Sequence, residues 1–151
     1  MKILIAEDDT ASRVMLEAFI KRWGHEPIPY SDGNAAMMAL RLKDGPPVAI
    51  LDWMMPGLDG IEICRRLREV QKTTYVLLLT SRDDRASLVQ GLESGANDYI
   101  RKPFDKEELR ARVQVGVRFA QLQSTLNLRL KELEDALIEI QTLKKRLGVP
   151  I

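Results

Sequence analysis

The sequence predicts an α/β protein in which a doubly wound, five-stranded parallel sheet is followed by an extended C-terminal helix. Short apolar segments alternate with longer amphipathic ones, which is typical of strands joined by helical crossovers. The apolar segments are continuous rather than alternating, which indicates burial on both faces, as parallel sheets require. A helical pattern without proline then runs from residue 105 to residue 147. This pattern predicts the long final helix.

The composition limits the classes of protein that the chain can belong to. Its 151 residues suffice for one domain with an appendage, and its net charge of +1 gives no global attraction to nucleic acid or to a membrane surface. No apolar run approaches the ~20 residues that a bilayer span needs. The lone Cys64 cannot form an internal disulfide, and a single histidine offers no zinc cluster. We therefore expect a cytoplasmic protein without a membrane partner.

Five apolar segments are expected to form the strands. They are residues 2–6, 25–30, 48–52, 75–79 and 98–101. The second contains Pro27 and Pro29, which cannot donate ladder hydrogen bonds, so it belongs at an edge of the sheet. The third ends abruptly in Asp52, before a turn at Pro56 and Gly57, and so delivers a carboxylate to a loop. Taken alone, Asp52 is equally consistent with a residue that caps a turn.

Helical patterns follow each of these segments. The expected helices are residues 11–23, 35–40, 61–70, 85–94 and 105–147. The first helix carries an apolar stripe at three-and-four spacing, expected to pack in the core: Met15, Leu16, Phe19, Ile20 and Trp23. Met37 and Met38 in the second helix are expected to fill gaps in the same core.

Three adjacent carboxylates, Glu7, Asp8 and Asp9, directly follow the first strand. Acids so close together repel one another, so a cation is needed to compensate them. A hard divalent ion such as Mg²⁺ is the usual one. The alternative is that these acids simply begin a helix and interact favourably with its dipole.

Polar residues from four separate stretches stand at the carboxyl ends of the expected strands. They are Glu7 with Asp8, Asp52, Thr80 and Lys102. In a doubly wound sheet the functional groove lies at this edge, where the strand order reverses. Turn chemistry alone does not explain four such stretches at one edge, so we expect them to form one site.

Together these residues resemble the receiver domain of two-component response regulators, which has a flavodoxin-like (CheY-like) fold. The resemblance covers residues 1–121. It is carried by the acidic pair, by L-D-W-M-M-P-G-L-D-G around Asp52, by Thr80, and by the stretches S-G-A-N-D-Y-I and K-P-F. It implies that Asp52 accepts a phosphoryl group from a sensor histidine kinase or a phosphotransfer protein, and that the chain is not otherwise an enzyme.

The resemblance also implies roles for the neighbouring residues. Mg²⁺ would be held by Asp8, Asp52 and the backbone carbonyl of Met54, with Glu7 orienting water around the ion. Lys102 would place its ammonium on the phosphoryl oxygens.

A switch is implied as well. The Thr80 hydroxyl would move toward the phosphate and leave space that Tyr99 fills. The Lys102–Pro103 peptide bond is expected to be cis. The resemblance assigns no role to Asp9.

The final helix is too long for one domain, since residues 105–147 would span ~64 Å. A heptad repeat places Gln123, Leu130, Leu137 and Lys144 at a, and Leu126, Leu133, Ile140 and Leu147 at d. Arg129 at g and Glu134 at the following e are able to pair across a parallel dimer. We expect residues 122–151 to be a homodimeric coiled-coil linker, paired along residues 123–147 and leading to an effector domain. The alternative is a helix that folds back on its own domain.

Three other classes of protein fit less well. Haloacid dehalogenase-type phosphohydrolases place a second Asp two residues after the nucleophile, where this chain has Met54. A dinucleotide-binding fold needs a glycine-rich loop where Glu7, Asp8 and Asp9 stand. A basic-zipper DNA binder needs a clustered basic region before its heptads, and here the basic residues are scattered. We therefore expect no direct binding of nucleic acid.

Overall fold

The computed structural model describes residues 1–150, in which strands and helices alternate five times. The strands are β1 (Lys2–Ala6), β2 (Glu26–Tyr30), β3 (Val48–Asp52), β4 (Tyr75–Thr80) and β5 (Asp98–Arg101). The helices are α1 (Thr10–Arg22), α2 (Gly33–Arg41), α3 (Gly60–Glu69), α4 (Arg85–Glu93) and α5 (Lys106–Arg146). The strands form one parallel sheet in the order β2-β1-β3-β4-β5. The predicted fold class, with its long C-terminal helix, is confirmed.

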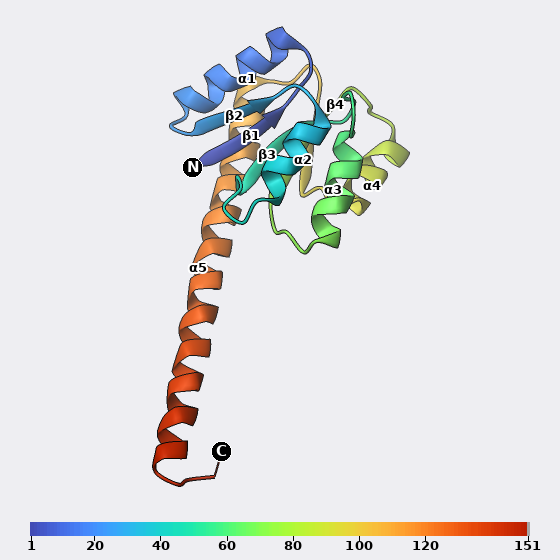
Figure 1. The fold of residues 1–151 in the computed structure, drawn as a ribbon. Coiled ribbons are helices and arrows are strands. Elements are labelled where there is room, and N and C mark those ends of the chain that lie inside the picture. Colours follow the sequence, from blue (N-terminus) through green and yellow to red (C-terminus); the bar gives the residue numbers. More distant parts are fainter. Residues whose placement is uncertain (151) are drawn as a thin grey trace. The chain divides into compact units, whose positions relative to one another are not determined.

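The sheet is covered on both faces (Figure 1). One core cluster joins alternate residues of β1, β3 and β4 to α2 and α3. The other joins the intervening residues to α1 and to the first part of α5. Every residue of β3 and β4 is buried, which explains why their sequences show no alternation of apolar and polar residues. The proline-containing β2 lies at the edge, as predicted.

The helices begin at aspartates. Asp9, Asp32, Asp59 and Asp84 are the N-caps of the first four helices, and each side chain accepts a hydrogen bond from a backbone N–H three residues later. Asp105 accepts the same kind of bond from Glu108 at the start of α5. Such caps satisfy N–H groups that a helix leaves without partners. Asp9, which the sequence motifs left without a role, is therefore the cap of α1.

Two methionines do not lie where the apolar patterns predicted. Met15 is 40% exposed and Met38 is 74% exposed, whereas Leu16 and Met37 beside them are buried. The prediction of core positions for Met15 and Met38 was wrong. A helix lying on a sheet buries one stripe, so apolar residues at the margin of that stripe remain in solvent.

The chain divides into two compact units, Met1–Ala120 and the residues from Gln121 onward, and α5 runs through the boundary. In the first unit α5 approaches the sheet closely at Gly116, where a Cβ atom would lie 2.7 Å from the Tyr75 ring. In the second unit, residues 124–150 are all exposed. None of the helices in the described part of the chain has the length and apolar character needed to cross a membrane.

Candidate functional site

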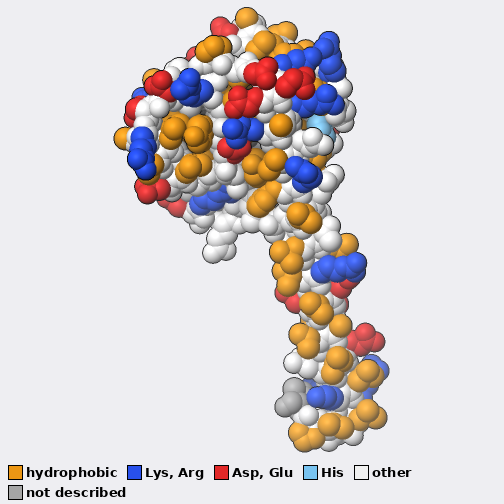
Figure 2. Space-filling view, turned by 180° about the vertical axis from the view of Figure 1, so that it is seen from behind, with side chains coloured by type: hydrophobic (Ala, Val, Ile, Leu, Met, Phe, Trp, Pro, Cys, Tyr) orange, Lys and Arg blue, Asp and Glu red, His pale blue; other side chains and the backbone are white. Residues whose placement is uncertain are grey.

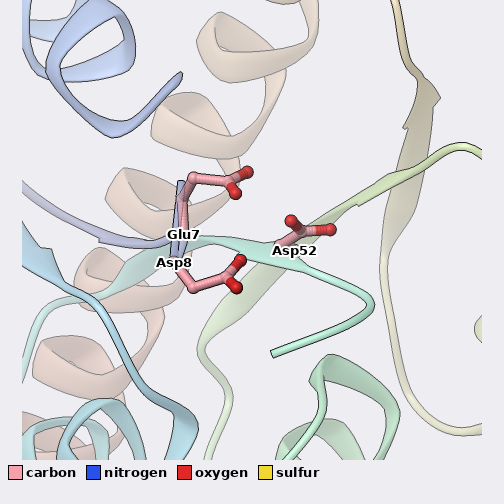
Figure 3. Close-up of side chains that lie close together, drawn as sticks. All are labelled: Glu7, Asp8 and Asp52. Carbon is pink, nitrogen blue, oxygen red and sulfur yellow. The ribbon is translucent and has the colours of Figure 1, made fainter. Parts of the chain in front are cut away.

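Three carboxylates meet at the carboxyl ends of the neighbouring strands β1 and β3 (Figure 3). Glu7 and Asp8 directly follow β1, and Asp52 is the last residue of β3. One oxygen of each carboxylate lies within 4.8 Å of the others. β1 and β3 are neighbours, with Ala6 paired to Leu51, so the parallel register itself brings the two strand ends together.

Lys102 bridges two of these carboxylates. Its Nζ donates to Glu7 Oε2 at 2.8 Å and to Asp52 Oδ2 at 2.9 Å. The backbone N–H of Lys102 donates to the Thr80 carbonyl at 2.8 Å, which fixes the lysine to the end of β4. The Lys102–Pro103 bond is cis, as expected. An ammonium from the β5–α5 loop therefore lies beside the carboxylate of the central strand.

The charges of the site are only partly balanced. Glu7 is 1% exposed, and this burial raises the pKa of its carboxyl group more than the hydrogen bond from Lys102 lowers it. Burial opposes the charge of Lys102, but the hydrogen bonds to Glu7 and Asp52 raise the pKa of its ammonium group. The Lys102 ammonium thus contacts two of the three carboxylates, so these four side chains carry formally more negative than positive charge.

The carboxylate cluster suits a hard divalent cation. Carboxylate oxygens are the ligands that Mg²⁺ prefers, and Mg²⁺ usually takes one or two of them and keeps several waters. Asp52 is 8% exposed, whereas Asp8 is exposed, so the cluster is open on the side of Asp8. Glu7, Asp8 and Asp52 are therefore the residues that fit a Mg²⁺ ion.

The two residues expected to form a switch lie on β4 and β5. Thr80 is 1% exposed and follows Leu79, which pairs with Asp52 in the neighbouring strand. Its Oγ1 accepts a hydrogen bond from the Arg82 backbone N–H at 2.9 Å. Tyr99 is half-buried and packs against the core cluster that involves α2 and α3.

Gly60, the first residue of α3, packs directly against the strand that carries Asp52. Its N–H donates to the Trp53 carbonyl at 2.9 Å, and a Cβ atom here would lie 2.6 Å from the Asp52 carbonyl oxygen. Only glycine allows this approach. The loop after β3 is thereby fixed directly behind Asp52.

Two arginines near the site were not singled out by the sequence patterns. The Arg13 Nη1 donates to the Glu7 carbonyl at 2.8 Å and so supports the backbone of the acidic pair. The Arg82 guanidinium lies over the Trp53 ring, 5.1 Å from its centroid, and its Nη2 is 3.9 Å from Met54 Sδ. Arg82 stands two positions after Thr80, but no pattern in the sequence indicated that it lies over Trp53. Arg13 carried no signal either, because it reaches the site from within a helix, at the end of the first turn of α1.

Comparison with known proteins gives a consistent result. Residues 3–114 match the response regulator receiver domain family. The chain is 40% identical over 123 residues to the transcriptional regulatory protein AfsQ1 of Streptomyces coelicolor, which covers 82% of this chain and 54% of AfsQ1. It is 40% identical over 137 residues to the phosphate regulon transcriptional regulatory protein PhoB of Rhizobium meliloti, covering 88% and 60% of the two chains.

A solved structure shows the same similarity in three dimensions. The receiver domain of the Francisella response regulator 1452 superposes with a TM-score of 0.74 at 31% identity, covering 81% of this chain and 98% of that one. This chain spans about half the length of several curated relatives that it matches. The family match covers most of the chain, and the acidic cluster lies within it. The chain therefore belongs to the response regulator receiver family.

Proposed function

We propose that Asp52 accepts a phosphoryl group from a sensor histidine kinase or a phosphotransfer protein in the cytoplasm, in a Mg²⁺-dependent reaction. The observation that carries this proposal is the Lys102 ammonium, 2.9 Å from the Asp52 carboxylate at the edge of an acidic cluster. An oxygen of Asp52 attacks the phosphorus of the donor's phosphohistidine. A P–O bond forms as the P–N bond breaks, and the donor histidine leaves with the electron pair of that bond.

The residues of the site have different electrostatic roles in this transfer. Lys102 is placed to follow the phosphoryl oxygens, because its flexible side chain already reaches Asp52. Asp8, Asp52 and the Met54 backbone carbonyl would hold Mg²⁺, with Glu7 orienting water around the ion. When bound, the ion neutralises the negative charge that the carboxylates and the phosphoryl group bring together. Outside this transfer and the later hydrolysis of the phosphate, we assign the chain no enzymatic activity.

We further propose that Thr80 and Tyr99 convert this local event into a change of surface. In the structure the Thr80 Oγ1 serves as an acceptor, so its own hydrogen remains available to a phosphoryl oxygen. A shift of Thr80 toward Asp52 changes the loop that follows β4 and makes room for the half-buried Tyr99.

The output of the chain is proposed to pass through the second unit. Residues 1–121 form the receiver, and residues 122–151 form a linker that pairs with a second copy and leads to an output domain or partner. The match to two relatives named as transcriptional regulators covers only 54% and 50% of their lengths, which supports an additional output region in those proteins. We propose that this chain itself does not bind nucleic acid.

Phosphorylation of Asp52 is tested by incubating the chain with Mg²⁺ and a small phosphodonor and measuring the mass of the intact protein. We expect one added phosphoryl group in the unmodified chain and none in Asp52→Asn. Asp59→Asn is a matched control because Asp59 caps α3 in the neighbouring loop and asparagine also caps helices. Equal labelling of Asp52→Asn and the unmodified chain would contradict the proposal.

Trp53 offers a separate test of metal binding. It is buried directly after Asp52, so its fluorescence should change on titration with Mg²⁺ or with Mg²⁺ and beryllofluoride. The other tryptophan, Trp23, is the C-cap residue of α1 and stacks on Phe19. A Trp23→Phe background leaves Trp53 as the source of the tryptophan signal. A flat titration in this background would count against a metal site at Asp52.

Light scattering tests the role of the second unit in dimerisation. A chain truncated before Ser124 should be a monomer under conditions in which the full chain is a dimer. A truncated chain that remains dimeric would place the interface on the first unit instead.

A further inference from the structure

The helical part of the second unit has a broad apolar surface, and every described residue from 124 to 150 is exposed. Figure 2 shows hydrophobic side chains along this helix. Their exposed fractions lie between 48% and 77% for Leu122, Leu126, Leu130, Leu133, Leu137, Ile140, Leu143 and Leu147. A two-stranded coiled coil needs only the narrow stripe formed by heptad positions a and d. This surface is wider, because it extends onto position g.

The apolar surface contains two overlapping seams that share their d residues. Both seams use Leu126, Leu133, Ile140 and Leu147. The a/d seam completes this row with Gln123, Leu130, Leu137 and Lys144. The d/g seam completes it with Leu122, Arg129, Ala136 and Leu143. A rotation of each helix by roughly 50° about its own axis exchanges one seam for the other.

The weak positions of the two seams are complementary. In the a/d seam the central residues Leu130 and Leu137 are apolar, and the polar residues stand at the ends. In the d/g seam the ends, Leu122 and Leu143, are apolar, and the centre contains a cation and a small residue. Neither seam is therefore well packed along its whole length, and neither is clearly superior in apolar contact.

The charges flanking the seams are reciprocal. In a parallel a/d dimer Arg129 stands beside Glu134 of the second copy, while Lys144 lies in the seam. In a parallel d/g dimer Lys144 stands beside Glu139 of the second copy, while Arg129 lies in the seam. Each packing thus gives one cation an interhelical partner and places the other cation between the helices. In the single chain Arg129 pairs with Glu132 at 3.0 Å, which leaves Glu134 available to a second copy.

The same charges favour a parallel over an antiparallel arrangement. An antiparallel pair that keeps the leucine layers of the a/d seam places Leu130 against Ile140. The centre of that arrangement sets Glu134 opposite its own copy. Like charges facing each other across a seam are unfavourable.

We propose that the second unit pairs in parallel with a second copy of itself through two alternative seams, a/d and d/g, and that the state of Asp52 changes their proportions. This inference rests on the dimer of the proposed function and adds its regulation. Two packings of one sequence with similar stability form a two-state element, which a signal shifts by favouring one of them. The cations Arg129 and Lys144 are the residues that set the balance.

Cysteine cross-linking in the full chain tests the proposal. Ala136→Cys reports the d/g seam and Leu137→Cys reports the a/d seam, while Asp135→Cys on the outer face is the matched control. Leu126→Cys lies in both seams and would not face its own copy in the antiparallel arrangement. The native Cys64 is buried and provides a low background. Under mild oxidation we expect disulfide dimers at residues 126, 136 and 137 to exceed those at residue 135 by about fivefold or more.

Two further substitutions should move the ratio of cross-linking at residues 136 and 137 in opposite directions. Lys144→Leu removes a cation from the a/d seam and should lower cross-linking at residue 136 relative to residue 137. Arg129→Leu removes a cation from the d/g seam and should raise cross-linking at residue 136 relative to residue 137. Both side chains belong to exposed residues of the second unit, so neither substitution should disturb the first unit. Mg²⁺ with beryllofluoride should also change the ratio.

The outcomes separate this inference from the function on which it rests. Cross-linking at residue 137 without residue 136, in every variant and state, would establish a single seam and overturn the proposal. An unchanged ratio after the Trp53 signal confirms beryllofluoride binding would overturn the link to Asp52. Absence of any dimer in light scattering would instead contradict the dimer of the proposed function, while leaving phosphorylation of Asp52 to its own test.

Discussion

In the first unit, one basic side chain lies at the carboxyl ends of the strands (the carboxyl edge) and another lies at their amino ends (the amino edge). Each joins several segments, but the groups that the two side chains contact differ in charge. At the carboxyl edge Lys102 contacts the carboxylates of Glu7 and Asp52. At the amino edge Arg68 of α3 donates to neutral acceptors. These are the carbonyls of Lys72, Thr74 and Gly95 and the side-chain oxygen of Asn97, at 2.7–3.0 Å.

The difference distinguishes a stabilising set of contacts around Arg68 from a cluster of repelling carboxylates around Lys102, which is the arrangement expected of a functional site. Neutral carbonyls satisfy the donors of Arg68 without any mutual repulsion, so the amino edge needs no further ligand. The carboxyl edge holds three carboxylates beside one ammonium, and a cation bound there would offset the repulsion between them. Functional sites commonly retain such unfavourable groupings, which the remainder of the fold must offset.

The largest change in stability is expected from removing the Arg68 guanidinium at the amino edge. Arg68→Ala leaves three carbonyls without their donor and should lower the free energy of unfolding by about 3 kcal/mol in urea titration. Arg65→Ala is the matched control on the same helix, because the Arg65 side chain is 51% exposed. That control should change stability by no more than about 0.5 kcal/mol. Equal effects of the two substitutions would refute the role assigned to Arg68.

Reactivity of Cys64 reports how tightly the amino edge is closed. Burial raises the pKa of its thiol to about 11, so little thiolate exists at neutral pH. Alkylation by iodoacetamide, followed by mass spectrometry, should be slower than that of an unfolded chain by about two orders of magnitude. Arg68→Ala should accelerate the reaction, whereas Arg65→Ala should not. Rapid labelling of the native chain would show that this region opens readily.

Removing a negative charge from the carboxyl edge should raise the free energy of unfolding, whereas Arg68→Ala should lower it. Without divalent ions, Asp8→Asn relieves repulsion and should raise the free energy of unfolding by about 0.5 kcal/mol. With saturating Mg²⁺ the unmodified chain should become the more stable one, because ligand binding stabilises the folded state. Asp44→Asn, at an exposed loop position, is the control. No reversal of the order by Mg²⁺ would argue against Asp8 as a ligand.

Asp9, adjacent to Asp8, should behave differently because it caps a helix. Hydrogen bonds from Ser12 lower the pKa of its carboxyl group. The stabilisation is therefore present above the unfolded pKa and is lost as the pH falls through the lower, folded value. Thermal unfolding from neutral to acid pH should show this loss in the unmodified chain. Asp9→Asn should reduce the loss and Asp9→Ala should lower the midpoint at neutral pH. Identical profiles for all three chains would contradict the capping role.

The comparison also shows which features the sequence could predict. Glu7, Asp52, Thr80 and Lys102 were each readable as polar residues at the ends of apolar segments. Their convergence followed from the parallel sheet, since all carboxyl ends of its strands lie at one edge. The cap formed by Asp9 was not predicted, although aspartate before a helical pattern is a local signal for one. Arg68 was not, because its acceptors in residues 72–97 are assembled only when α3 packs beside β4 and β5.

The sequence by itself determined the order of strands and helices, the edge position of β2 and the set of residues at the carboxyl edge. Hydrophobic periodicity, prolines and caps act over a few residues and are therefore written locally in the chain. Only the tertiary structure decided that Lys102 bridges Glu7 and Asp52, that Arg82 lies over Trp53, and that Met15 and Met38 remain exposed. These outcomes depend on the distances and packing angles between elements, which no local pattern encodes.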